Sequence, residues 1–130
     1  MNHLYKNHKL YDENRDPVFF NNGFLDVTYF EIMTPDEPIG YARNCTVAVF
    51  QSGLIEMRAI DKDQSVLESF NISDILMASN NINNCDPRHI NEVSLITHTR
   101  DYRITFQSLE EKRAFWSALT TTYNKLHPEL

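Results

Sequence analysis

The sequence is poor in glycine and cysteine and has no long hydrophobic run. Its 130 residues include 3 Gly and 2 Cys, so neither a glycine-rich phosphate-binding loop nor a disulfide scaffold is expected. No segment approaches the roughly 18 apolar residues that a membrane span needs. The start Met1-Asn2-His3 does not form a signal peptide, and Asn2 is not the glycine that N-myristoylation requires. These absences predict a cytoplasmic protein with reduced thiols and no transmembrane segment.

Basic residues are also scarce. The chain has 12 Lys and Arg against 18 Asp and Glu, which gives a formal net charge of −6. Sequence-independent nucleic-acid binding depends on Lys and Arg that neutralise phosphates, so no nucleic-acid partner is expected. The whole acidic excess lies between residues 17 and 75, which carry nine acids and three bases. That part of the chain is therefore a poor candidate for a phosphate-binding site.

Hydrophobic residues between Val18 and Gln107 recur at every second position, which is the period of a β-strand. Leu25, Val27 and Tyr29, for example, alternate with polar residues. Because short polar turns separate such segments, the pattern predicts seven strands in an antiparallel sandwich or barrel. The predicted strands comprise residues 25–29, 45–49, 54–60, 66–70, 72–77, 93–97 and 102–106.

The period changes at Ser108, where an amphipathic helix is expected. The segment Ser108-Leu109-Glu110-Glu111 is a capping-box sequence, in which the Ser108 hydroxyl accepts the Glu111 amide and the Glu111 carboxylate reaches back. Pro128 ends the helix. A stripe about 120° wide is predicted to pack on the sheet, with Trp116 as the plug of the core. The stripe comprises Leu109, Phe115, Trp116, Leu119, Tyr123 and Leu126, with the stem of Lys112 lying along it.

Seven strands followed by one helix resemble the pleckstrin-homology-like (PH-like) superfamily. The matching residues are Gly23-Phe24-Leu25, the last strand Tyr102–Phe106, and Ser108–Glu111 leading to Phe115–Leu119. The resemblance implies a mainly β fold with one α-helix: a seven-stranded antiparallel open barrel or sandwich, capped by a C-terminal amphipathic helix. It also implies a domain of residues 17–127, an N-terminal extension of residues 1–16 that is a short helix or flexible, and a tail of residues 128–130.

The basic signature of phosphoinositide-binding relatives is missing. In those relatives Lys and Arg lie at the end of the first strand, in the next loop and in the second strand. Residues 28–43 of this chain carry three acids and one base, Arg43, so phosphoinositide binding is not expected. A small cluster of His98, Arg100 and Arg103 is the alternative site for an anionic headgroup. The competing interpretation of that cluster is an exposed hairpin of mixed charge.

Other relatives bind an extended peptide beside the fifth strand and the C-terminal helix. By this resemblance, a partner groove is expected between one strand and one helix face, whose small side chains leave room for a partner. The competing interpretation is an ordinary exposed helix face. The groove residues are Ile72, Ile75 and Met77 on the strand side and Ala118, Thr121 and Thr122 on the helix side.

The first strand is a second candidate surface because both of its faces are apolar. Phe24, Phe30 and Ile32 lie on the face opposite Leu25 and its neighbours. One of these faces is expected to be covered by the N-terminal segment or by another chain.

The sequence contains no catalytic motif, no cofactor motif and no metal-ligand spacing. We therefore expect neither an enzyme nor a bound cofactor or metal. The predicted function is a non-catalytic interaction or scaffold module that binds a protein partner or self-associates. The alternative is a peripheral membrane-targeting domain that binds anionic phospholipid headgroups through His98, Arg100 and Arg103.

Asparagine is abundant, at 13 of 130 residues. A barrel without the phosphoinositide signature in such a chain is similar to the inner-membrane-complex sub-compartment proteins of apicomplexan parasites. Those proteins are acylated at an N-terminal glycine and cysteine and use a PH-like domain for protein contacts. The resemblance implies a cytoplasmic location, peripheral to a membrane or to the cortical cytoskeleton through an anchor that is not present in this chain.

Overall fold

The long first strand, β1 (Pro17–Tyr29), is the middle strand of the sheet and pairs with two others. In the computed structural model, which describes residues 17–30, 39–81 and 89–128, β1 pairs along its length with β2 (Gly40–Phe50). Its second half also pairs with β7 (Arg100–Thr105). The predicted extension of residues 1–16 and the apolar residue Ile32 lie outside the described residues.

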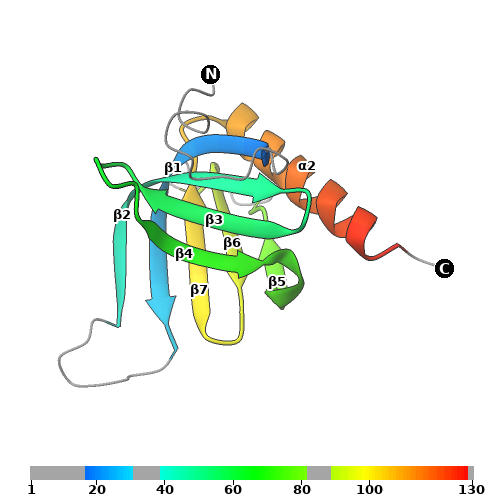
Figure 1. Cartoon of the computed structure of the whole chain (residues 1–130), viewed down its shortest axis with the longest axis horizontal. Coiled ribbons are helices and arrows are strands. Elements are labelled where there is room, and N and C mark those ends of the chain that lie inside the picture. The colour runs from blue at the N-terminus through cyan, green and yellow to red at the C-terminus, as the bar shows by residue number, and fades with distance from the viewer. Residues whose placement is uncertain (1–16, 31–38, 82–88, 129–130) are drawn as a thin grey trace.

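Within the described ranges, seven antiparallel strands form one sheet in the order β4-β3-β2-β1-β7-β6-β5. The sheet curls into an open barrel, and helix α2 (Leu109–Leu126) lies across one end of it (Figure 1). This architecture confirms the predicted fold class. The remaining strands are β3 (Leu54–Ala59), β4 (Val66–Asn71), β5 (Met77–Ser79) and β6 (Glu92–Ile96).

The alternation seen in the sequence sorts side chains between the two faces of the sheet. Leu25 and Val27 are 0% and 1% exposed, whereas Asp26 between them faces solvent. The second half of β2, from Cys45 to Phe50, is buried throughout. Burial raises the pKa of the Cys45 thiol to about 12, although the nearby charge of Arg43 opposes this effect. The thiol therefore stays protonated at neutral pH and behaves as part of the apolar core.

The predicted strand over residues 72–77 is wrong. Residues Ile72–Asp74 form a short 3₁₀ helix, η1, and strand β5 starts only at Met77. The Asn71 side chain accepts the amide of Ser73 at 2.9 Å, and the Asp74 carboxylate accepts the amide of Asn71 at 3.0 Å. These local side-chain bonds satisfy the backbone in a turn of helix and so compete with strand pairing.

Gly53 connects the β2–β3 hairpin to η1. Its φ of +93° is a conformation that side-chain-bearing residues rarely adopt. Its amide donates to the Phe50 carbonyl at 2.9 Å, and its carbonyl accepts the amide of Ile72 at 2.7 Å. An added Cβ would lie 2.8 Å from Cδ1 of Leu126. The hairpin, η1 and the end of α2 therefore meet at this residue.

Helix α2 begins as the sequence predicts, but only half of the capping box forms. The Ser108 hydroxyl accepts the amide of Glu111 at 3.2 Å. The return bond from the Glu111 carboxylate is missing from the cap, and Glu111 Oε1 is buried without a hydrogen-bond partner in the described part of the chain. At its other end, the His127 amide donates to the Tyr123 carbonyl at 2.9 Å just before Pro128.

The buried face of α2 is rotated from the predicted stripe. The predicted plug, Trp116, is only partly buried, and Tyr123 is 46% exposed. Phe115, at 0% exposure, fills the core instead. Its ring lies 5.4 Å from that of Phe19 and 5.1 Å from that of Phe106. A helix with Trp116 at the centre of its buried face and a helix with Phe115 there both satisfy the 3.6-residue period. The packing of Phe115 against Phe19 and Phe106 favours the second orientation.

Replacement of Phe115 should therefore cost more stability than replacement of its larger neighbour. We expect Phe115→Ala to lower the free energy of unfolding by about 3–5 kcal/mol, as for other buried aromatic residues. Trp116→Ala should cost less, about 2 kcal/mol, because its side chain packs at the margin of the core and is only partly buried. Urea denaturation of both variants checks this order. A larger loss for Trp116→Ala would show that Trp116 is the plug.

Candidate functional site

A groove runs between the start of β5 and helix α2. On the sheet side it is formed by Ile72, Ile75 and Met77, three of the residues predicted from the sequence, together with Leu76. The cavity there measures about 300 Å³. Leu76 is 58% exposed and Met77 is 62% exposed, so apolar side chains line the groove and remain in contact with solvent. The helix side of this cavity comprises Trp116, Leu119, Thr120 and Tyr123.

A second cavity of about 580 Å³ continues the groove along the helix, because Trp116 and Thr120 line both. Lys112 and Arg113 are the charged residues of the combined lining. Lys112 is 3% exposed and its ammonium donates to the Ile90 carbonyl at 2.7 Å. Burial and the charge of Arg113 lower the pKa of Lys112, whereas Glu92 opposes them. Arg113 is exposed and gives this end of the groove its positive charge.

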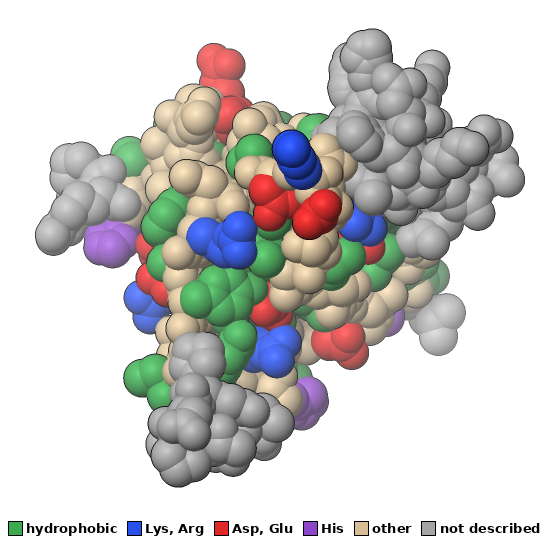
Figure 2. Space-filling model, turned by 60° about the vertical axis from the view of Figure 1, so that its left-hand side comes forward, with side chains coloured by type: hydrophobic (Ala, Val, Ile, Leu, Met, Phe, Trp, Pro, Cys, Tyr) green, Lys and Arg blue, Asp and Glu red, His purple; other side chains and the backbone are tan. Residues whose placement is uncertain are grey.

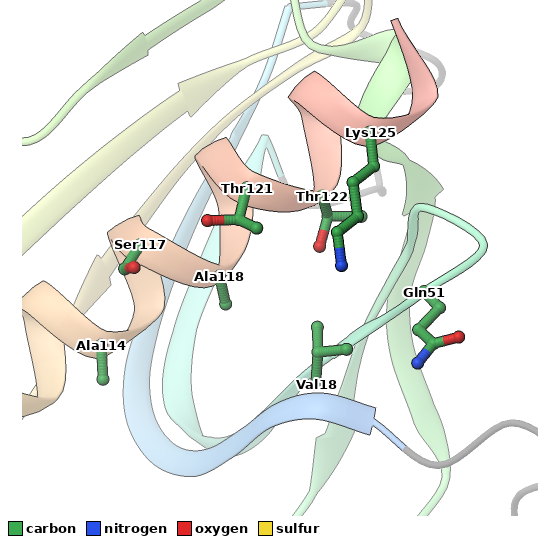
Figure 3. A pocket seen from close by; sticks show the side chains of 8 residues that line it. All are labelled: Val18, Gln51, Ala114, Ser117, Ala118, Thr121, Thr122 and Lys125. Carbon is green, nitrogen blue, oxygen red and sulfur yellow. The ribbon is translucent and has the colours of Figure 1, made fainter. Parts of the chain in front are cut away.

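The structure does not bring the two halves of the predicted groove together. Ala118, Thr121 and Thr122 line a different cavity, of about 590 Å³, which lies between α2 and the start of β1 beside Val18 and Gln51 (Figure 3). Successive helix residues are about 100° apart, so Thr120 and Thr121 face opposite sides of the buried stripe. The sequence indicates that small residues occur on this helix but not which edge of the helix lies over β5.

The predicted basic cluster is likewise divided. His98 is exposed in the turn before β7. Arg100 shares the inner face of β7 with buried Tyr102, whereas Arg103 lies on the outer face and pairs with Asp101 at 3.5 Å. Strand residues separated by an odd number of positions point to opposite faces. Arg100 and Arg103 therefore do not converge on one ligand.

Arg100 instead meets a buried carboxylate at the barrel mouth, the end of the barrel where β1 ends and β2 and β7 begin. The Glu68 side chain, 2% exposed, accepts from Arg100 Nη1 at 2.8 Å. The same Oε1 accepts from the Tyr102 hydroxyl at 2.9 Å, and Oε2 accepts from the Tyr41 hydroxyl at 2.7 Å. The Arg100 guanidinium also lies 4.7 Å from the ring centre of Tyr29. Strands β4, β2 and β7 thus converge on one anion.

These contacts perturb the titration of the donors. Burial, and then the Glu68 hydrogen bonds and charge, raise the pKa values of Tyr41 and Tyr102, with Arg100 opposing them at Tyr102. Burial alone lowers the pKa of Arg100, but its contacts with Tyr102 and Glu68 outweigh this effect and raise it. All three donors are therefore held in the protonated forms that donate to Glu68.

One feature of the sequence could have indicated this network, namely the spacing of Glu68 and Phe70. Glu68 stands two residues before Phe70, which stacks on Tyr102 at 4.6 Å, so an acid shares a strand face with a core aromatic. Glu68 also pairs with the buried residue Met57 of β3, so its side chain faces the interior. The partners of Glu68 come from distant strands, which local alternation does not identify.

The outer face of β1 is partly apolar, as predicted. Phe24 is 44% exposed and Phe30 is 52% exposed. A cavity of about 500 Å³ lies between Phe24 and Ile60, and polar side chains such as Asn22 and Asn44 border it. Figure 2 shows that acidic, basic and hydrophobic side chains are interspersed on one face of the molecule, with no broad patch of one sign there.

Among residues 17–30, 39–81 and 89–128, no group of three or more His, Cys, Asp and Glu side chains is placed to hold a metal ion. No helix in these ranges has the length and apolar character needed to cross a bilayer.

No protein-family model and no curated protein matches the sequence. A structure of the Vav1 exchange factor, described for the structural role of its PH and C1 domains, matches with a TM-score of 0.58 at 14% identity, covering 84% of this chain and 26% of that one. The Ran-binding domain of Nup2 from Ashbya gossypii matches with a TM-score of 0.57 at 15% identity, covering 88% and 100%. The PH domain of PfAPH matches with a TM-score of 0.55 at 12% identity, covering 82% and 84%.

These matches define the fold. The chain has the PH-like fold, as the resemblance predicted. It spans about a quarter of the length of the Vav1 chains that it matches.

Loss of the Glu68 carboxylate should destabilise the chain. We expect Glu68→Ala to lower the free energy of unfolding by about 3 kcal/mol, near the low end for an uncompensated buried charge, because Arg100 retains some contact with water. Arg103→Gln, which removes an ion pair on the outer face, should cost about 0–1 kcal/mol. Urea denaturation compares them. Equal losses would show that the Glu68 network adds no stability.

The raised pKa values of Tyr41 and Tyr102 predict a pH dependence. Their neutral forms are favoured in the folded chain, so this stabilisation is complete below the ordinary tyrosine pKa of about 10 and is lost as the pH rises above it. Tyrosinate absorbance should therefore show that both ionise only when the chain unfolds in alkali. Tyr41→Phe and Tyr102→Phe should each remove one late-titrating group. Ionisation of all tyrosines near pH 10 in the folded chain would contradict the network.

Proposed function

We propose that this PH-like domain is a non-catalytic interaction module that binds an extended segment of a protein partner in the β5–α2 groove. The observation that carries the proposal is the pair of joined cavities beside an edge strand, both lined by Trp116 and Thr120. The supporting features are the free edge, the exposed apolar side chains and the charge of the groove.

The first support is the edge of the sheet. β5 is the last strand in the sheet order, and within the described residues it pairs with β6 alone. Every residue of β5 is exposed. An edge strand presents unpaired backbone donors and acceptors, which an extended peptide satisfies when it adds as another strand.

The second support is apolar surface next to that edge. Leu76, Met77 and Tyr123 are each between 46% and 62% exposed, and all three line the same cavity. Clustered apolar side chains around a hollow are typical of a binding surface, whereas single exposed apolar residues are not. An apolar anchor side chain of the partner would fill this cavity.

The third support is charge, and it indicates the chemistry of the partner. The chain as a whole has a net charge of −6, yet the groove is lined by Lys112 and Arg113 without an acidic residue. Lys112 is committed to the Ile90 carbonyl, so Arg113 is the group left to contact a ligand. The occupant that fits is therefore an extended segment with apolar anchors and an acidic residue at the Arg113 end.

The anionic-lipid alternative has less support. Of its three proposed residues, Arg100 is bound to Glu68, and Arg103 pairs with Asp101 on the opposite face of β7. An anionic headgroup would have to compete with both carboxylates.

A selection from a random peptide library tests the proposal. We expect bound peptides to combine apolar residues with an acid. Thr120→Arg should lower the affinity for these peptides about tenfold or more, because the arginine side chain would fill the groove. The matched control Thr121→Arg, on the other side of the helix, should change this affinity less than about twofold. Fluorescence anisotropy measures both. Arg113→Glu should reverse the preference toward basic peptides.

Two outcomes would contradict this function. One is that peptides bind but respond to Thr121→Arg and not to Thr120→Arg, which would place the ligand in the cavity beside β1. The other is that the selection returns no peptide of the expected chemistry.

A further inference from the structure

The mouth of the barrel contains a set of converging donors that resembles an anion-binding site. Arg100 Nη1 and the hydroxyls of Tyr41 and Tyr102 approach the Glu68 oxygens at 2.7–2.9 Å. A guanidinium with two hydroxyl donors is a common way to bind a carboxylate or a phosphate, since both present several acceptor oxygens. Here the acceptor belongs to the chain itself.

The positions of these groups show that the site faces solvent on one side. The Glu68 side chain is 2% exposed, but that of Arg100 is 39% exposed. Tyr29 ends β1, Tyr41 lies at the start of β2 and Arg100 starts β7. Figure 1 shows these strand ends together at the end of the barrel away from α2. A small ligand therefore has access to Arg100 from solvent.

We propose that the barrel mouth is an oxyanion-binding site whose ligand is the Glu68 carboxylate of the same chain. The ligand class that the donors fit is phosphate, either free or as the monoester of a headgroup. In the wild-type chain an external phosphate would have to displace Glu68, which would leave that negative charge next to its own. The built-in carboxylate therefore keeps the mouth closed to phosphate.

The register of β4 supports this assignment. β4 is the other edge of the sheet, and its residues Glu68 and Phe70 pair with the buried residues Met57 and Ile55 of β3. Glu68 and Phe70 therefore both face the interior. Phe70 on the same face stacks on Tyr102 at 4.6 Å and holds that hydroxyl beside the carboxylate. The site thus has a fixed scaffold that remains when the carboxylate is removed.

Calorimetric titration with inorganic phosphate tests the proposal. The wild-type chain should show no binding, whereas Glu68→Ala should bind phosphate at least about tenfold more tightly than the wild type. The double variant Glu68→Ala with Arg100→Ala should return to the wild-type value. Asp101→Ala is the matched control. It frees Arg103 on the outer face of β7, where no hydroxyl groups converge on the guanidinium, so this variant should bind phosphate no better than the wild type.

A second variant keeps the test valid if Glu68→Ala does not fold. Glu68→Gln keeps the length of the side chain and removes its charge, so phosphate should then shift the NMR signal of the Arg100 guanidinium, which stays unchanged in the wild type. If the folded Glu68→Ala or Glu68→Gln chain binds phosphate no better than Asp101→Ala, the proposal is wrong. It is also wrong if the wild type binds phosphate as tightly as Glu68→Ala.

Vesicles distinguish the two sources of phosphate. Phosphatidylcholine vesicles with and without phosphatidylinositol 4-phosphate are sedimented with Glu68→Ala, or with Glu68→Gln if Glu68→Ala does not fold. Sedimentation only with the phosphorylated lipid supports a site that accepts headgroup monoesters. Phosphate binding without sedimentation supports a site for free phosphate. Sedimentation that persists in the double variant would overturn the proposal, because the lipid would then bind elsewhere.

Discussion

The buried Glu68 carboxylate is the interaction that joins distant strands at the mouth of the open barrel. A charge with 2% side-chain exposure needs compensating donors, and these come from β2 and β7. The sheet ends at β4 on one side and at β5 on the other. Glu68 ties the β4 end to β7 across the interior, so that edge strand is anchored. The β5 edge has no such tie in the described residues and lies open beside α2.

The two ends of the molecule therefore differ in the groups that they offer to a ligand. At the mouth, the cationic group that a phosphate would need is already paired with Glu68. Beside α2, apolar side chains and an exposed arginine line a groove whose lining includes no acidic side chain. This difference is the basis of the proposal that the chain binds a polypeptide rather than a phosphorylated headgroup. The PH-like fold accommodates both uses because the strands and the helix are the same and only the lining residues differ.

The fold could be predicted from the sequence because the patterns that indicate its strands and its helix are local. Alternation in β1 and β2, the Ser108 cap and the helix period require only neighbouring residues. The two errors have different causes. The local side-chain bonds of Asn71 and Asp74 convert a predicted strand into η1. The distant packing of Phe115 against Phe19 turns α2 so that Trp116 lies at the groove. The sheet half of the predicted groove, Ile72, Ile75 and Met77, was expected from the resemblance to peptide-binding relatives, and these residues line one cavity in the structure. The helix half depended on a rotation that the sequence does not encode locally.

The central claim is that a partner segment occupies the β5–α2 groove, and the single tryptophan of the chain reports on it. Trp116 is the one Trp in the sequence and lines both cavities of the groove. Its fluorescence during titration with an apolar, acidic peptide is therefore the most direct measurement. A saturable blue shift, as the ring leaves water, is the predicted result. Saturable binding by anisotropy with unchanged Trp116 emission would contradict the account, because the peptide would then lie elsewhere.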